Sequence, residues 1–131
     1  MKFSAKITDQ GSAETFSKVV HTAAKLSKKC VLRIGVDKMC FVQNETHKDH
    51  AHALWIEIVA NHIFQDFRLD GLSPEANEVV LEIAPDEVAR VLRPAVLAKQ
   101  IRIKLTKKDN TPHMTFEIKP QARSFFLFFL A

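Results

Sequence analysis

The chain has 131 residues, of which 47% are hydrophobic and 26% are charged, and its formal net charge is +4 at pH 7. This length suits one domain that buries a core without metal or disulfide support, and the composition excludes an intrinsically disordered chain. The modest positive charge permits a polyanionic partner without requiring one.

The first residues predict a strand. Over residues 2–8, Phe3, Ala5 and Ile7 alternate with polar side chains, as in a half-buried strand. This start lacks the apolar run of a secretory signal, and no stretch approaches the roughly 20 apolar residues that span a bilayer. The two cysteines are typical of a reducing compartment. We therefore expect an intracellular protein without membrane contact.

Residues 12–29 are predicted to form an amphipathic helix, with Ser12 as its N-cap. At about 100° per residue, one face collects Phe16, Val19, Val20, Ala23, Leu26 and Ser27. Lys18, Lys25 and Lys29 fall on the opposite face, and Lys28 lies with Lys25 and Lys29 near the negative end of the helix dipole. The basic face is either an ordinary solvated surface or a surface for phosphates.

Residues 30–43 are expected to form a hairpin that pairs Ile34 with Met39. In this register Cys30 and Cys40 point to opposite faces, so they cannot form a disulfide. Both are predicted to be buried free thiols.

The polar segment 43–52 contains His47, His50 and His52, which could bind a metal if the backbone brought them together. The segment offers no cysteine and no fourth ligand, and polar loops often collect histidine. We predict no metal site and no cofactor. A metal-dependent enzyme stays open as an alternative that depends on this loop alone.

Alternation in the remaining chain predicts strands at 53–59, 67–70, 78–83, 101–106 and 113–119, with one helical turn at 61–66. Strands outnumber helices, hairpin connections dominate, and the rhythm of a parallel α/β sheet is missing. The order predicts an α+β domain in which two helices cover one side of a mainly antiparallel sheet.

The second helix is expected to start at Pro85, with acidic residues in its first turn. Pro94 should kink or weaken it, because proline removes a backbone hydrogen bond. Arg90 and Arg93 project from the face opposite its apolar residues, which are Val88, Val91, Leu92, Ala95 and Val96.

Taken together, the two helices favour two interpretations about equally: a surface for diffuse contact with phosphates, and an ordinary solvated surface. An enzyme is disfavoured, because the chain has no glycine-rich phosphate loop, nucleophile elbow or zinc-helix motif. The apolar neighbours of Cys30 and Cys40 also disfavour a reactive thiolate.

The chain contains, in order, MKFSAKI, AKLSKKCVLRI, VDKMCF, LWIEI, IFQDFRLDGLS, NEVVLEI and IRIKLTKK. In their joint order and spacing these segments, which extend over about residues 1–119, resemble the Hus1-type subunit of the heterotrimeric DNA-damage checkpoint clamp. This family is related to proliferating cell nuclear antigen. The resemblance implies a sliding-clamp fold, in which subunits of two domains form a ring around duplex DNA, with sheets outside and helices lining the hole.

The resemblance also implies a non-enzymatic platform for checkpoint signalling and repair. Its expected partners are two related clamp subunits, a clamp loader and duplex DNA, in the nucleus or alternatively the cytoplasm. The residues expected to face DNA and contact its phosphates are Lys18, Lys25, Lys28, Lys29, Arg90 and Arg93.

The resemblance weakens at the end of the chain. We expect residues 1–119 to form the clamp-type N-terminal domain and residues 120–131 to form a divergent Phe-rich tail, with the second clamp domain absent. In related clamps the last strand of the first domain helps pair with the neighbouring subunit. The tail either supplies that strand or is a non-homologous end. The alternative function is therefore a truncated protein-interaction fragment that cannot close a ring.

Overall fold

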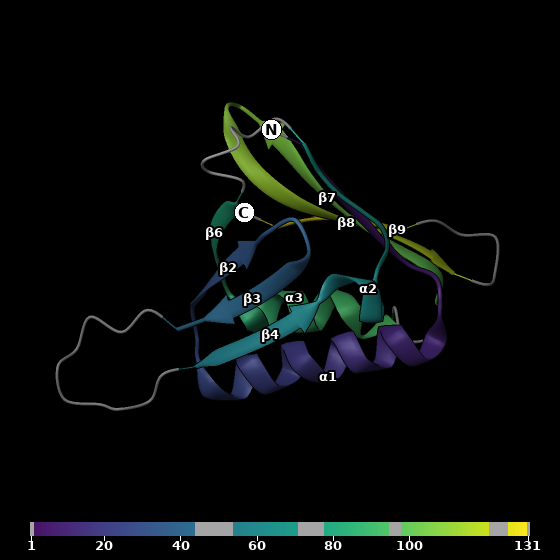
Figure 1. Cartoon of the computed structure of the whole chain (residues 1–131), viewed down its shortest axis with the longest axis horizontal. Coiled ribbons are helices and arrows are strands. Elements are labelled where there is room, and N and C mark those ends of the chain that lie inside the picture. Colours follow the sequence, from purple (N-terminus) through teal and green to yellow (C-terminus); the bar gives the residue numbers. More distant parts are fainter. Residues whose placement is uncertain (1, 44–53, 71–77, 95–97, 121–125, 131) are drawn as a thin grey trace, which may run out of the picture.

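The computed structural model describes residues 2–43, 54–70, 78–94, 98–120 and 126–130. The elements in chain order are β1 (Lys2–Ile7), α1 (Gln10–Leu26), β2 (Cys30–Ile34), β3 (Lys38–Val42), β4 (Trp55–Val59), α2 (Ala60–Ile63), β5 (Gln65–Asp70), β6 (Val79–Ile83), α3 (Pro85–Leu92), β7 (Ala98–Lys108), β8 (Thr111–Pro120) and β9 (Phe126–Leu130) (Figure 1). The α+β class predicted from the sequence is confirmed.

The strands form two antiparallel sheets, where the sequence pattern had indicated a single one. The five-stranded sheet has the order β5-β1-β7-β8-β9, and the four-stranded sheet has the order β4-β3-β2-β6. Helices α1 and α3 contact each other and lie side by side along one side of the molecule (Figure 1). The helices therefore share one side of the molecule, as predicted. Their faces that point away from the core are left for other contacts.

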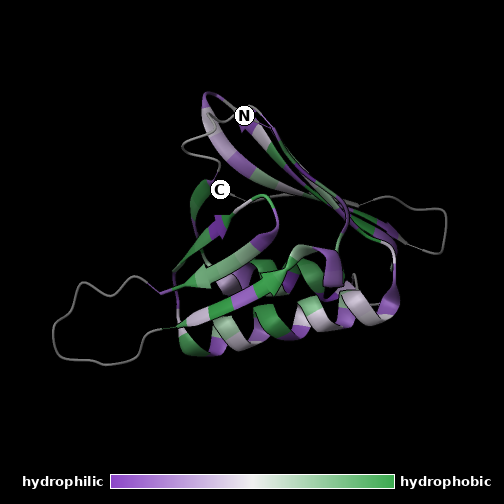
Figure 2. Ribbon diagram, viewed as in Figure 1, coloured by the Kyte–Doolittle hydropathy of each residue, from purple (hydrophilic) through white to green (hydrophobic). Residues whose placement is uncertain are grey.

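One hydrophobic core joins both sheets and the helices. Its largest fully buried side chains include Phe16 of α1, Phe41 of the four-stranded sheet and Phe116 of the five-stranded sheet. Hydrophobic and hydrophilic positions alternate along α1 in Figure 2. The core therefore places α1 with its apolar side inward and its basic side outward.

The hairpins follow the predicted pairing. Ile34 pairs with Met39 between β2 and β3, and both Cys30 and Cys40 are buried free thiols, as expected. The β7–β8 hairpin turns through Asp109 and Asn110, whose φ angles of 53° and 63° are left-handed. Asp and Asn tolerate this conformation better than most residues, which explains a two-residue turn at this point.

The start and end of α1 differ from the sequence prediction. Asp9 is the N-cap, because its carboxylate accepts a hydrogen bond from the Ser12 amide at 2.9 Å. The prediction of Ser12 as N-cap is therefore wrong. At the other end Ser27 is the C-cap, so the following lysines lie outside the helix, and Leu26 is 60% exposed instead of packing in the core.

Helix α3 begins at Pro85, as predicted, and buries Val88, Val91 and Leu92. Arg93 is its C-cap, so Pro94 follows the end of the helix and does not kink it. Pro94 has no amide hydrogen with which to continue the backbone hydrogen bonds of the helix, which accounts for this end although Arg93 itself has the helical φ and ψ angles of −54° and −54°. Two further residues of the predicted apolar face, Ala95 and Val96, fall outside the described residues.

The short helix also differs from expectation, whereas the tail contains a strand, one of the two alternatives left open by the sequence. The single helical turn is Ala60–Ile63, and Gln65 and Asp66 already belong to β5. Within the Phe-rich tail, Phe126–Leu130 forms the strand β9, which pairs with β8. The tail thus extends the five-stranded sheet.

We predict that Asp9→Ala destabilises the fold by about 1 kcal/mol, because an amide at the start of α1 loses its acceptor. Urea denaturation at neutral pH measures the free energy of unfolding. Asp9→Asn keeps an accepting oxygen and should cost clearly less. Equal losses in the two variants would contradict capping by the Asp9 side chain.

Candidate nucleic-acid interface

A groove runs between α1 and α3 on the side of the helices away from the core. It has a volume of about 460 Å³ and is lined by His21, Ala24 and Lys25 of α1 and by Asp86, Ala89, Arg90 and Arg93 from α3 and its C-cap. The small side chains of Ala24 and Ala89 leave space between the longer basic ones. The two predicted basic faces therefore meet in one surface.

The groove is positively charged. Lys25, Arg90 and Arg93 are exposed, and Asp86 is the acidic residue among those that line it. Within the part of the chain that the structure describes, none of the three cations takes part in an ion pair. Cations without internal partners are available to an external anion.

Lys18 extends this surface along α1. A neighbouring depression of about 530 Å³ is lined by Glu14, Ser17, Lys18, His21, Thr22 and Lys25. Because His21 and Lys25 line both hollows, Lys18 continues the surface of the groove. We call the surface formed by Lys18, His21, Lys25, Arg90 and Arg93 the basic groove.

Lys28 and Lys29 do not line the basic groove. Both are exposed in the connection between α1 and β2. The Lys29 ammonium lies 3.8 Å from Glu82 Oε1 of β6, so its charge has a partner on the four-stranded sheet. The structure thus brings together Lys18, Lys25, Arg90 and Arg93, four of the six residues expected to face DNA, and separates these two lysines from them.

His21 was not identified as a site residue from the sequence. Its Nδ1 lies 2.7 Å from the backbone carbonyl oxygen of Ser17 and donates to it, since a carbonyl can only accept. This bond orients the ring one helical turn before Lys25. The spacing of His21 from Lys18 and Lys25, three and four residues, was the available signal.

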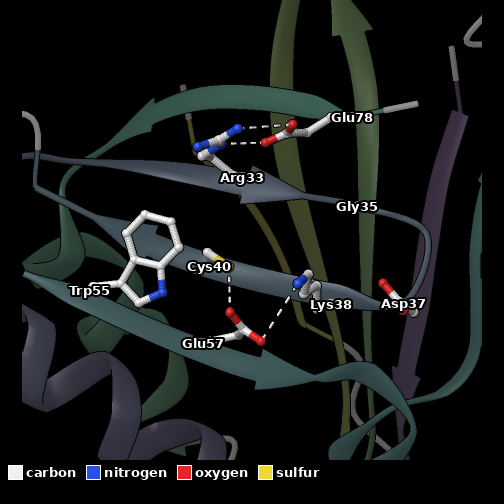
Figure 3. A pocket seen from close by; sticks show the side chains of 8 residues that line it. All are labelled: Arg33, Gly35, Asp37, Lys38, Cys40, Trp55, Glu57 and Glu78. Carbon is white, nitrogen blue, oxygen red and sulfur yellow. Dashed lines mark hydrogen bonds and ion pairs between the residues drawn. The ribbon is translucent and has the colours of Figure 1, made fainter. Parts of the chain in front are cut away.

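A second pocket, of about 240 Å³, lies on the outer face of the four-stranded sheet (Figure 3). Its two cations, Arg33 and Lys38, are paired with carboxylates of the chain. Arg33 Nε donates to Glu78 Oε1, Arg33 Nη2 donates to Glu78 Oε2 at 3.1 Å, and Lys38 Nζ lies 3.7 Å from Glu57 Oε1. A polyanion would have to break these pairs, so the basic groove fits such a ligand better.

The two thiols are poorly suited to nucleophilic chemistry. Burial raises the pKa of Cys30 to about 11. Burial, and then the nearby Glu57 carboxylate, raises the pKa of Cys40, whose Sγ lies 4.0 Å from Glu57 Oε2. A reactive cysteine requires the opposite shift.

The described residues contain no group of three or more His, Cys, Asp or Glu side chains that could hold a metal ion. His47, His50 and His52 lie outside the described residues. Among the helices that the structure describes, none has both the length and the apolar character needed to cross a bilayer.

Comparison with known proteins identifies relatives. Residues 1–124 match the family model described as Hus1-like protein. Over 119 residues the chain is 34% identical to Checkpoint protein HUS1 of Homo sapiens. The aligned region covers 91% of this chain and 42% of that protein. It is 32% identical over 93 residues to Checkpoint protein Hus1-like of Drosophila melanogaster, covering 70% of this chain and 34% of that protein.

A third relative, Checkpoint protein hus1 homolog of Dictyostelium discoideum, is 31% identical over 121 residues, which are 91% of this chain and 42% of that protein. The chain therefore spans less than half the length of each of these relatives.

The Arg33–Glu78 pair makes a testable prediction about pH. Hydrogen bonds from Arg33 lower the pKa of Glu78. A carboxyl whose pKa is lower in the folded chain stabilises the fold above its unfolded pKa, and this stabilisation disappears as the pH falls through the folded pKa. Arg33→Ala should raise the pKa of Glu78 and reduce stability at pH 7, with the difference from the original chain vanishing in acid.

Carboxyl chemical shifts in an NMR titration measure this pKa. Lys38→Ala is the matched control, because it removes a cation paired with Glu57 and should leave Glu78 unchanged. An unaltered titration of Glu78 in Arg33→Ala would show that Arg33 does not set its pKa.

Proposed function

Because the chain belongs to the Hus1-like protein family, we propose that it is a non-enzymatic subunit of the DNA-damage checkpoint clamp, a heterotrimer that encircles DNA as a platform for checkpoint signalling and repair. Its fold is the α+β fold of a clamp-like domain. The observation that best supports the proposal is the basic groove between α1 and α3, whose cations have no partner among the described residues.

In this proposal the two helices face the DNA and contact its phosphates. Lys18 and Lys25 are separated by about 10 Å along α1, over which duplex DNA presents roughly six phosphate charges. Arg90 and Arg93 add two cations from the neighbouring helix. Contacts of this kind attract the duplex without reading its bases, which suits a ring that must move along any sequence.

We propose that Lys28 and Lys29, which lie outside the basic groove, make weaker phosphate contacts at its periphery. They lie beyond the end of α1, and Lys29 can reach a phosphate only by giving up its exposed pair with Glu82. Exposed pairs of this kind contribute little to stability, so a phosphate could replace the carboxylate. We expect smaller effects at these positions than at Lys25 or Arg90.

The proposed partners are two related clamp subunits, a clamp loader and duplex DNA, and the proposed location is the nucleus, with the cytoplasm as the alternative. We assign residues 1–119 to a clamp-type N-terminal domain and residues 120–131 to a divergent tail. The family match extends to residue 124, slightly into that tail.

A second candidate is a protein-interaction fragment that binds clamp partners without closing a ring. One observation favours it. Strand β9 is the last strand of the five-stranded sheet, the position that the resemblance assigns to contact with a neighbouring subunit, and its sequence belongs to the divergent Phe-rich tail.

We predict that Lys25→Gln/Arg90→Gln weakens retention of the assembled complex on DNA, with the largest loss relative to the original chain at low salt and a smaller one at higher salt. Each phosphate contact adds about 0.9 to the slope of log affinity against log salt, so the double variant should lower the slope by roughly 2. The chain is co-expressed with its two related subunits and loaded on nicked circular DNA, and retention is measured over a range of salt concentrations.

Lys107→Gln/Lys119→Gln is the matched control, since it removes the same charge from exposed positions on the five-stranded sheet. An equal effect in both double variants would refute phosphate contact by the basic groove. Size-exclusion chromatography tests the assembly separately. A chain that fails to co-purify with the two subunits would exclude the heterotrimer and leave the interaction-fragment hypothesis.

A further inference from the structure

His21 brings to the basic groove a side chain whose charge is not fixed. The lysines and arginines of the groove stay positive across the physiological range, whereas an imidazole, with an ordinary pKa of about 6.5, gains or loses its charge near neutrality. His21 lines both the groove of about 460 Å³ and the neighbouring depression of about 530 Å³, so it lies where the two hollows meet. Any ligand that spans the basic groove passes over this ring.

A hydrogen bond to the helix backbone determines which ring nitrogen is free. Nδ1 of His21 donates to the backbone carbonyl oxygen of Ser17 at 2.7 Å, and the Ser17 hydroxyl lies 3.4 Å from the same nitrogen. Nδ1 therefore carries the proton of the neutral ring. Nε2 has no hydrogen-bond partner among the residues that the structure describes. In the neutral ring this nitrogen has a lone pair, so it accepts hydrogen bonds and cannot donate one.

This tautomer decides what His21 offers to a phosphate. The oxygens of a phosphodiester accept hydrogen bonds, so the neutral ring has no donor for them at Nε2. Protonation makes both ring nitrogens donors, and Nδ1 keeps its bond to Ser17 while Nε2 donates to the phosphate. The ring does not have to rotate between the two states. Contact between His21 and a phosphate therefore requires one additional proton.

The charged groups that line the two hollows with His21 come from both helices. They are Glu14, Lys18 and Lys25 of α1, and Asp86, Arg90 and Arg93 of α3 and its C-cap. A phosphate held by the cations of this set places negative charge beside the imidazole, and negative charge favours the imidazolium form. The phosphate and the proton then strengthen each other's binding, because such coupling is reciprocal.

We propose, as an extension that rests on the proposed function, that His21 is a proton-dependent phosphate contact in the basic groove. Binding of duplex DNA takes up one proton from solvent at Nε2 of His21, and no covalent bond changes. Because DNA prefers the protonated ring, affinity is highest at mildly acidic pH and falls as the pH rises through neutrality. At higher pH the lysines and arginines hold the duplex alone.

The test compares the full chain with the full-length variants His21→Gln and His21→Arg. The probe is a short fluorescein-labelled DNA duplex of mixed sequence, and fluorescence anisotropy at low salt gives the dissociation constants. Phosphodiesters keep a single negative charge over the pH range used, so a change in affinity belongs to the protein. His62→Gln is the matched control, because His62 is exposed on α2 and does not line the basic groove.

We expect the original chain to bind the duplex roughly fivefold more tightly at about pH 6 than at about pH 8. His21→Gln should bind at every pH as weakly as the original chain does at the higher pH. His21→Arg, whose charge is permanent, should bind tightly throughout, and His62→Gln should behave as the original chain. A pH dependence that persists unchanged in His21→Gln would overturn the proposal.

The double variant Lys25→Gln/Arg90→Gln separates this inference from the proposed function. Weaker binding by the double variant, together with an unchanged pH dependence in His21→Gln, would refute the role of His21 and leave the groove as the DNA contact. Binding by the double variant as tight as that of the original chain at every pH would refute both. If the original chain binds no duplex at low salt, the role of His21 is refuted, while DNA retention by the assembled complex still tests the proposed function.

NMR on the unmodified chain gives an answer even if the variants unfold. At neutral pH, addition of the duplex should move the ring-carbon signals of His21 toward the positions of an imidazolium. The ring signals of His62 should stay in place. His21 signals that do not move as the duplex binds would show that no proton is taken up there and would overturn the proposal.

Discussion

The orientation of α1 depends on a chain of phenylalanine contacts. Phe16 of α1 lies with its ring centroid 5.4 Å from that of Phe64, Phe64 lies 5.5 Å from Phe67, and Phe67 lies 5.2 Å from Phe3 of β1. Burying an aromatic ring of this size contributes about 2–3 kcal/mol, so rotating α1 about its axis would be costly. This contact sets the direction of Lys18 and Lys25, and therefore the place of the basic groove relative to α3.

Local sequence patterns predicted most of the strands, since alternation records which side chains face the core. The register of β2 with β3 followed from a short turn, and the start of α3 followed from Pro85. The cap of α1 was missed because Asp9 and Ser12 are both good capping residues, and local preference does not choose between them. The exposure of Leu26 depends on where the helix ends, which helical periodicity does not indicate.

The division of strands into two sheets depends on pairings between distant segments, such as β1 with β7. The same limit applies to the basic groove. Charge patterns indicated the basic face of each helix separately, but the contact between α1 and α3 decides which cations share a surface. Lys29 illustrates this, because its spacing placed it with Lys25, whereas a pair with Glu82 of β6 draws it to the four-stranded sheet. Long-range contacts of this kind leave no local signal.

Trp55 gives this chain a built-in optical reporter. It is the single tryptophan, the chain has no tyrosine, and its indole is 59% exposed on the outer face of β4 beside Cys40 and Glu57 (Figure 3). Since an indole's emission responds to its solvent environment, ultraviolet fluorescence from this protein reports on one face only. A ligand bound in the basic groove leaves the face around Trp55 exposed to solvent. A protein bound on the outer face of the four-stranded sheet excludes solvent from it. The two sides of the domain can therefore be followed separately without a label.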